Sequence, residues 1–216
     1  MNWNSEYRCA LMGEELVIRA LPGLFSPGRL DAGTAAMLRH VEFQPGQRVL
    51  DLGCGAGVVG ILAARKCGAE GVVLSDVDAA AVACARENAA LNGVPGVRIV
   101  CSDGFRSLEE TGFDLILCNP PYQSDFAVAR HFIEKGFNRL KLGGRMYMVT
   151  KRRDWYRNKL AAIFGGVRVR ETDGYFVFEA EKRQTEYARA GKAGRLRKPG
   201  SHESVATEAG RPPRKE

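Results

Sequence analysis

Hydrophobic and polar positions follow two alternating patterns along most of the chain. Short apolar runs that end at Gly, Asp or Asn are typical of buried strands, and the segments between them have helical length and composition. Strands are predicted over 48–53, 71–76, 97–103, 113–119 and 143–151, with helices over 58–67, 79–93 and about 127–140. Strand and helix in repeated succession predict a parallel sheet that is covered by helices on both faces.

The two ends of this region have a different pattern. After Lys151, a helix over 154–166 is followed by two alternating runs that flank Asp173 and Gly174. Asp-Gly between alternating runs is a strong hairpin signal, so the sheet is expected to end in an antiparallel pair. A second hairpin is predicted around Gly13 and Glu14, before a helix over about 31–42. The expected fold is therefore α/β and Rossmann-like, with a mostly parallel sheet of about seven strands.

Composition supports a single globular domain. The 216 residues are 45% hydrophobic and 26% charged, which suits one domain over 1–183, with 1–24 as an N-terminal hairpin extension. Residues 184–216 contain eight Lys or Arg against four Asp or Glu and have no apolar periodicity, so they are expected to form a flexible basic tail. Such a tail is either an arm that touches phosphates or a solubilising terminus.

Other features exclude several classes of protein. Without an apolar run near the roughly 18 residues of a membrane helix, and without a signal peptide, the chain is expected to be cytoplasmic with no membrane partner. The cysteines are widely spaced, which argues against disulfides and a zinc site and favours small core residues: Cys9, Cys54, Cys67, Cys84, Cys101 and Cys118. His40, His131 and His202 are too scattered for a triad or a metal site, so no metal is expected.

A glycine-rich loop follows the first strand of the predicted sheet and opens a helix. Glycines allow close backbone approach to a ligand, and a helix N-terminus offers unpaired N–H groups, so this is a nucleotide-type site. The candidate cofactor-binding residues in the loop are Asp51, Gly53, Cys54, Gly55 and Gly57. The run from Gly55 to Gly60 also fits the dinucleotide fingerprint, which leaves a nicotinamide-dependent oxidoreductase as an alternative.

Carboxylates lie at the ends of three successive strands and favour another cofactor. Asp51 would repel a diphosphate but suits a positively charged ligand such as S-adenosylmethionine. Asp76, followed by Val77, can accept from ribose hydroxyls, and Asp103, followed by Gly104, can accept from an adenine amino group. Asp78 is better explained as a helix N-cap.

The segment Asn119-Pro120-Pro121-Tyr122 is the strongest catalytic candidate. Two prolines end a strand and stiffen the backbone, which would hold the Asn119 side chain and the Pro120 carbonyl as acceptors. Two acceptors beside a methyl donor would bind the protons of an exocyclic amine and turn its lone pair toward the methyl carbon. Tyr122 would stack on the planar target. Asn-Pro-Pro is otherwise an ordinary turn sequence.

Together, the strings VLDLGCGAG, SDVD, SDGF and NPPY resemble class I S-adenosylmethionine-dependent methyltransferases that modify a planar amino nitrogen. The upstream segments 22–26 and 30–34 are similar to those of the small-subunit ribosomal RNA methyltransferase C family, and the resemblance covers roughly 7–182. It implies S-adenosylmethionine as cofactor, RNA as partner and guanine N2 as target. It also implies that Phe25 lies over the cofactor and that Asp31 and Thr34 open the preceding helix beside it.

The resemblance leaves several alternatives open. NPPY also occurs in enzymes that methylate adenine N6 or the glutamine amide of release factors. The longer family members carry two methyltransferase-like domains, whereas only the catalytic one is expected in this chain. A non-catalytic RNA-binding module is disfavoured by the intact string from Asn119 to Tyr122. The choice between monomer and homodimer is also left open.

A basic segment follows the fifth strand. Lys151, Arg152, Arg153, Arg157 and Lys159 lie near Trp155 and Tyr156 in the sequence. Phosphate contacts with aromatic stacking would hold single-stranded RNA at the rim of the site. A solvated helix face with two aromatic residues turned inward is the other interpretation.

Overall fold

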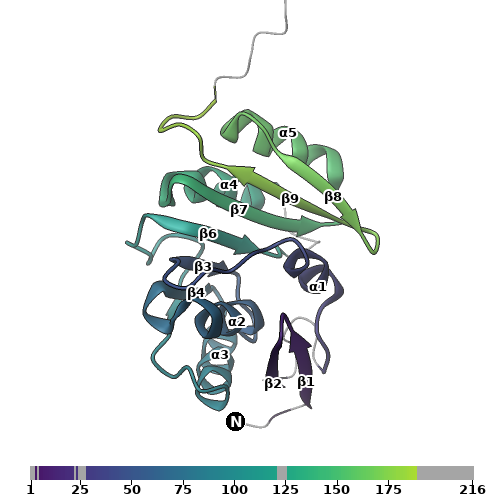
Figure 1. The fold of residues 1–216 in the computed structure, drawn as a ribbon, viewed down its shortest axis with the longest axis vertical. Helices are drawn as coiled ribbons and strands as arrows, with labels where there is room; N and C mark the ends of the chain where they lie inside the picture. Colours follow the sequence, from purple (N-terminus) through teal and green to yellow (C-terminus); the bar gives the residue numbers. More distant parts are fainter. Residues whose placement is uncertain (1–2, 4, 22, 24–27, 121–125, 189–216) are drawn as a thin grey trace, which may run out of the picture.

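The computed structural model describes residues 3, 5–21, 23, 28–120 and 126–188, which form an α/β fold around a seven-stranded sheet (Figure 1). The sheet contains β3 (Val49–Leu52), β4 (Val72–Asp76), β5 (Arg98–Cys101), β6 (Phe113–Cys118), β7 (Leu140–Thr150), β8 (Arg168–Thr172) and β9 (Tyr175–Glu181). The helices are α1 (Ala32–Leu38), α2 (Val58–Cys67), α3 (Ala79–Leu91), α4 (Phe126–Arg139) and α5 (Arg153–Phe164), with a short 3-10 turn η1 (Ala69–Gly71). The predicted fold class is confirmed.

The strand order is β5-β4-β3-β6-β7-β9-β8. The first five strands are parallel, and β9 runs antiparallel to both β7 and β8. The direction of winding reverses between β3 and β6, which come together although two strands separate them in the sequence. Ligands of open α/β sheets bind at such a switch point, outside the carboxyl ends of the strands.

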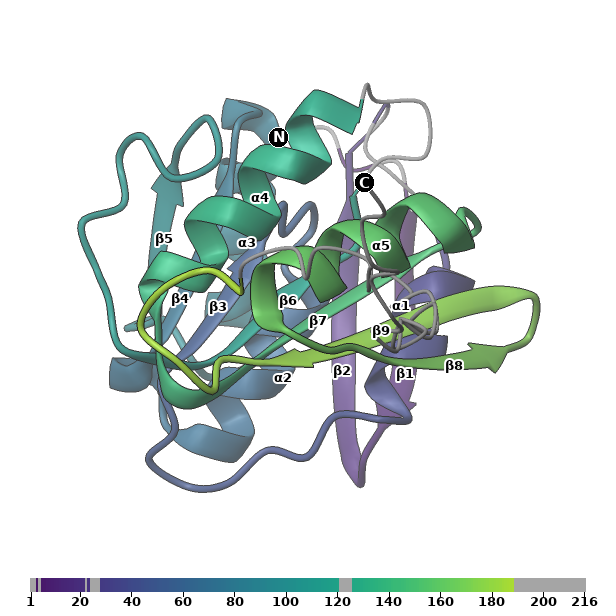
Figure 2. The same ribbon diagram turned by 90° about the horizontal axis from the view of Figure 1, so that it is seen from above.

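Alternating side chains divide the interior into two cores. Val49 of β3 faces the first core, beneath α1, α2 and α3, whereas Leu50 and Leu52 face the second, beneath α4 and α5. Figure 2 shows α4 and α5 on the opposite side of β6, β7 and β9 from α1 and α2. Strands with apolar residues on both faces require this double cover.

The N-terminal hairpin forms a separate two-stranded sheet of β1 (Ser5–Leu11) and β2 (Glu14–Ala20). Its turn is centred on Met12 and Gly13, which have φ of 52° and 81°, one residue earlier than predicted. Left-handed backbone at both turn positions matches the twist of a hairpin. Leu16 and Ile18 of β2 are fully buried in the first core, so the hairpin packs on the main body.

The hairpin predicted at Asp173 and Gly174 is confirmed. Asp173 and Gly174 have φ of 52° and 76° and connect β8 to β9. In contrast, α1 is shorter than the predicted helix over about 31–42. It ends at Leu38, and the next turn is closed by hydrogen bonds from His40 N to Met37 O and from Val41 N to Leu38 O.

Packed structure continues past the predicted end of the domain at residue 183. Tyr187 donates a hydrogen bond to Glu134 O at 3.0 Å, and its ring meets Phe137 edge-on at 5.1 Å. Ala188 N donates to Ile163 O. The Tyr187 side chain and the Ala188 backbone thus anchor residues that the sequence assigned to the tail.

The cysteines are all free thiols, but not all are core residues as predicted. Cys54, Cys67, Cys84 and Cys118 are buried and Cys9 is half-buried, whereas Cys101 is exposed. Cys101 ends β5, an edge strand of the sheet. In the described part of the chain, no helix combines the length and apolarity needed to cross a membrane.

Candidate active site

A cavity of about 430 Å³ opens where the strand order reverses, at the carboxyl ends of β3, β4 and β6. The glycine loop after β3 forms its floor, and the start of α1 and residues of the N-terminal hairpin form part of its wall. The lining includes most of the residues singled out in the sequence: Asp31, Thr34, Asp51, Gly53, Cys54, Gly55, Asp76, Val77, Asp103, Gly104, Asn119 and Pro120. Residues distant in sequence therefore meet in one cavity.

The glycine loop has a backbone that only glycine adopts readily. Gly53, Gly55 and Gly57 have φ of 78°, 54° and 87°. A Cβ at Gly53 or Gly55 would meet no described atom within 4 Å, so conformation rather than crowding selects glycine there. Gly57 is the N-cap of α2 and offers no side chain to cap it. In the first turn, Asp51 accepts from Gly60 N, which leaves the N–H groups of Val58 and Val59 for a ligand.

Gly60 has a packing role. A Cβ at this position would lie 2.2 Å from Leu74 Cγ, so α2 rests directly on β4. Close helix–strand packing is also the role of the last glycine in the dinucleotide fingerprint. The match from Gly55 to Gly60 thus has a structural basis that does not by itself identify a dinucleotide.

Asp51 places a buried carboxyl beneath the loop. It is 4% exposed, and its Oδ2 accepts a hydrogen bond from Gly60 N at 2.8 Å. Burial raises the pKa of Asp51 to about 7, the Gly60 hydrogen bond opposes this rise, and nearby Asp76 adds to it. A positively charged ligand would favour the ionised carboxylate, whereas a diphosphate would oppose it.

Asp76 holds the loop and faces the same cavity. Its Oδ2 accepts from Gly55 N at 2.8 Å and its Oδ1 from Asp78 N at 3.0 Å. A carboxylate has about four acceptor positions, so two hydroxyl groups can still bind. Asp78 caps α3 by accepting from Ala80 N at 2.8 Å, as predicted.

Asp103 and Val77 lie at the open side of the cavity. The Asp103 side chain is 65% exposed and pairs with Arg106 at 3.4 Å, and Val77 is 67% exposed. Gly104 has φ of 59°, and a Cβ there would lie 3.1 Å from His131. This close approach brings Phe132 of α4 into the cavity lining, which the sequence analysis missed because helical spacing alone gives no such signal.

Asn119 is fixed in orientation by the N-terminus of α1. Its Nδ2 donates to Asp31 Oδ2 at 2.7 Å and to Thr34 Oγ1 at 3.1 Å. Asp31 also caps α1 by accepting from Thr34 N at 2.7 Å. Because the amide nitrogen points to α1, the amide oxygen points the other way. Phe25, Pro121 and Tyr122 lie outside the described residues.

The basic segment after β7 divides into two parts. Lys151, Arg152 and Arg153 are exposed. Lys151 lies over the ring of Tyr175, Arg152 over that of Phe126 and Arg153 over that of Phe176. Trp155 stacks on Phe126 at 4.4 Å and Tyr156 is buried, so these aromatic rings turn inward. Lys159 pairs with Glu134. Beyond Arg153, this segment is therefore a solvated helix face with its aromatic residues turned inward, rather than a surface with aromatic rings exposed to stack on RNA.

Among the described residues, no three His, Cys, Asp or Glu side chains are grouped so that they could hold a metal ion.

The family of the chain follows from its sequence as a whole. The model of the methyltransferase small domain matches residues 15–179. The chain belongs to the methyltransferase small domain family.

The relatives of this methyltransferase small domain include ribosomal RNA small subunit methyltransferases C of two Pseudomonas species. The protein of Pseudomonas putida strain F1 is 36% identical over 181 residues, covering 82% of this chain and 54% of the relative. That of Pseudomonas paraeruginosa is 35% identical over the same shares. The chain thus spans about half the length of the curated relatives it matches.

Solved structures with this fold include a 16S rRNA N2 methyltransferase of T. thermophilus in complex with AdoMet and guanosine. It is 28% identical, with a TM-score of 0.71, and the match covers 84% of this chain and 51% of that one. TrmN from Thermus thermophilus is also 28% identical, with a TM-score of 0.60, and the match covers 69% and 48% of the two chains. A methyltransferase from Pyrococcus furiosus at 21% identity, with a TM-score of 0.60 and a match over 81% and 91%, shares the fold.

Proposed function

We propose that the chain transfers a methyl group from S-adenosylmethionine to an exocyclic amine of a nucleobase, namely guanine N2 in small-subunit ribosomal RNA. Family membership supports methyl transfer. The names of the relatives support a ribosomal RNA substrate, and the T. thermophilus protein with AdoMet and guanosine supports guanine. The observation that carries the proposal is the Asn119 amide, locked by α1 beside the cavity of the glycine loop.

The cavity suits the proposed cofactor. Asp51 and Asp76 make its floor acidic, which favours the sulfonium and ammonium charges of S-adenosylmethionine over a diphosphate. Asp76 has acceptor capacity for the ribose hydroxyls, and exposed Val77 offers an apolar surface for adenine. When bound, S-adenosylmethionine supplies an electrophilic methyl carbon.

The chain contributes mainly by positioning the amine. An exocyclic amine on guanine is a poor nucleophile because its lone pair is delocalised into the ring. The Asn119 amide oxygen and the Pro120 carbonyl would accept its two N–H groups and turn the lone pair out of conjugation. The hydrogen bonds to Asp31 and Thr34 keep the oxygen, rather than the nitrogen, on the substrate side. The proton that the methylated nitrogen loses passes to water.

Exposed cations near the site fit an RNA substrate. Lys151, Arg152 and Arg153 follow the carboxyl end of β7, which neighbours β6, the strand that ends just before Asn119. Aromatic rings beneath these cations restrict their motion, so that less side-chain entropy is lost on binding phosphate. The net charge of +7 also favours association with a polyanion.

The proposal is tested with labelled S-adenosylmethionine and three substrates: small ribosomal subunits that lack the modification, naked small-subunit RNA and a peptide release factor. Mass spectrometry of the digested nucleosides should find N2-methylguanosine from one of the RNA substrates, and the Asn119→Ala variant should produce almost none. Label in methyladenosine would identify an adenine-N6 enzyme, and label in the release factor would identify a protein glutamine methyltransferase. Either outcome would contradict the guanine proposal.

A further inference from the structure

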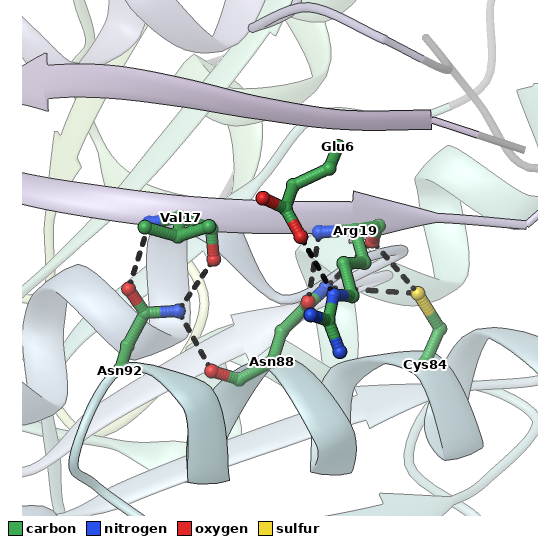
Figure 3. A network of polar contacts seen from close by, with 6 residues as sticks. All are labelled: Glu6, Val17, Arg19, Cys84, Asn88 and Asn92. Carbon is green, nitrogen blue, oxygen red and sulfur yellow. Dashed lines mark hydrogen bonds and ion pairs between the residues drawn. The ribbon is translucent and has the colours of Figure 1, made fainter. Parts of the chain in front are cut away.

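The outer edge of β2 is held by side chains of α3 rather than by another strand (Figure 3). Asn92 Oδ1 accepts from Val17 N at 2.9 Å, and Asn92 Nδ2 donates to Val17 O at 2.8 Å. One helical turn away, Asn88 Oδ1 accepts from Arg19 N at 2.9 Å, and Asn88 Nδ2 donates to Arg19 O at 2.8 Å. Each primary amide thus presents a donor and an acceptor to the strand, as a neighbouring strand would.

Asn88 has a third hydrogen bond, which leads to the candidate active site. Its Nδ2 also donates to Ala56 O at 2.9 Å, in the glycine loop. The Asn88 side chain is fully buried, so water cannot readily replace these contacts. One amide therefore joins the N-terminal hairpin, α3 and the glycine loop.

Asn92 is a natural counterpart that lacks this connection. Its second N–H donates to the helix carbonyl Asn88 O at 2.7 Å, and its hydrogen bonds within the described part of the chain stay in β2 and α3. Both asparagines hold the same strand edge through the same type of contact. Of the two, Asn88 alone also contacts the glycine loop. Substitutions at the two positions can therefore distinguish attachment of the hairpin from positioning of the glycine loop.

The glycine loop depends on such contacts. Three glycines with positive φ give it a large conformational freedom that must be restricted. On the β4 side, Gly53 N and Cys54 N donate to Ser75 O, and Gly55 N donates to Asp76. The Ala56 carbonyl is held by Asn88 of α3.

The hairpin itself contributes to the cavity. Tyr7 of β1 and Ala20 of β2 line it together with Ala56. From this geometry we infer that Asn88 is a positioning residue. It fixes the hairpin and the glycine loop relative to each other around the cavity, so that cofactor affinity depends on the hairpin. The inference rests on the proposed function, because it takes the cofactor to be S-adenosylmethionine.

The test compares Asn88→Asp with Asn92→Asp. An aspartate keeps the acceptor for the strand N–H but has no N–H to donate. Calorimetry with S-adenosylhomocysteine should give a Kd about tenfold higher for Asn88→Asp, the loss expected for one buried hydrogen bond. Asn92→Asp should stay within about twofold of the unaltered protein, although both variants unfold at lower temperature.

Steady-state kinetics separates positioning from general damage. Asn88→Asp should raise the KM for S-adenosylmethionine and leave kcat at saturating cofactor nearly unchanged. Asn88→Ala and Asn92→Ala form an uncharged pair that should repeat the difference, because each variant removes the amide contacts without introducing a carboxylate. Equal affinity in the Asn88 variants and the unaltered protein, or equal weakening in both pairs, would overturn the inference.

Amide hydrogen exchange tests the contact without any ligand. Asn88→Ala should speed exchange at Gly55 and Gly57, whereas Asn92→Ala should leave the glycine loop unchanged. If the unaltered protein bound no S-adenosylhomocysteine, the proposed function would fail, yet this measurement would still decide the role of Asn88. If a variant does not fold, amide hydrogen exchange in the unaltered protein tests the coupling instead. Binding of S-adenosylhomocysteine should slow exchange of the Arg19 amide, and an unchanged rate there would overturn the inference.

Discussion

The carboxylate of Asp31 holds the amide of Asn119 across 88 positions of sequence, at 2.7 Å from Oδ2 to Nδ2. The same oxygen accepts the Thr34 backbone N–H at 2.7 Å and so caps α1. The start of a helix and the end of the strand β6 are thus fixed by one atom. Any change at Asp31 should therefore alter both the stability of α1 and the orientation of Asn119.

Removing the Asn119 amide should separate cofactor binding from turnover. In Asn119→Ala, kcat should fall by about 10²–10³, because the lost acceptor acts on the reacting amine. Affinity for S-adenosylhomocysteine should change by less than about threefold. Calorimetry and a methyl-transfer assay on the same preparation measure both quantities. A parallel loss of affinity and turnover would reject the role given to Asn119.

Substitutions of Asp31 should distinguish its two contacts. Asp31→Ala removes the cap and should lower the free energy of unfolding by about 1 kcal/mol, together with kcat. Asp31→Ser keeps a good N-cap residue but is too short to hold Asn119, so stability should recover while kcat stays low. Denaturant titration and steady-state kinetics are the measurements. If kcat recovered with the cap, the contact with Asn119 would have no role in turnover.

The buried Asp51 predicts a pH dependence with a definite sign. Its pKa rises from 3.8 when exposed to about 7 in the fold, so the folded state retains a proton that the unfolded chain releases. This contribution therefore makes the free protein less stable as pH increases from about 4 to about 7, with no further loss above that range. Chemical unfolding across this range should show the trend, and Asp51→Asn should weaken it.

Cofactor binding should show the opposite trend. Ionised Asp51 attracts a cationic ligand, so affinity for S-adenosylmethionine should rise as pH passes from about 6 to about 8. Asp51→Asn should bind more weakly and flatten the profile. Calorimetry in buffers with different ionisation enthalpies should also detect a proton released from the protein on binding below about pH 7. An affinity that falls with pH in the unaltered protein would contradict the acidic-floor interpretation.

The contact between Gly60 and Leu74 predicts a destabilising substitution that can be rescued. In Gly60→Ala the new methyl group would meet Leu74 Cγ at 2.2 Å, and such overpacking costs about 1–3 kcal/mol. Leu74→Ala should remove the clash, so Gly60→Ala should cost little in that background. A double-mutant cycle from denaturant titrations measures the coupling. Additive costs would mean that α2 shifts away from β4 instead.

Features with local causes were predictable from the sequence. The Asp173–Gly174 turn and the Asp78 cap depend on residues within a few positions, and the strands depend on short apolar runs. Longer contacts have no such signal. Asn88 lies in an ordinary helical sequence, yet its partner Arg19 is 69 positions away. Exposed Cys101 and packed Tyr187 were misjudged for the same reason, because edge position and tertiary contact determined their environment.

Attaching β2 through two asparagines has a consequence for how such proteins diversify. An exposed strand edge invites pairing with other chains, and the amides of α3 occupy that edge without extending a sheet. Two side-chain replacements on α3 would thus free the outer edge of β2, while the seven central strands kept their ladder of hydrogen bonds. The wall that the hairpin adds to the cavity can therefore change in evolution without any change in the hydrogen bonding of the central sheet.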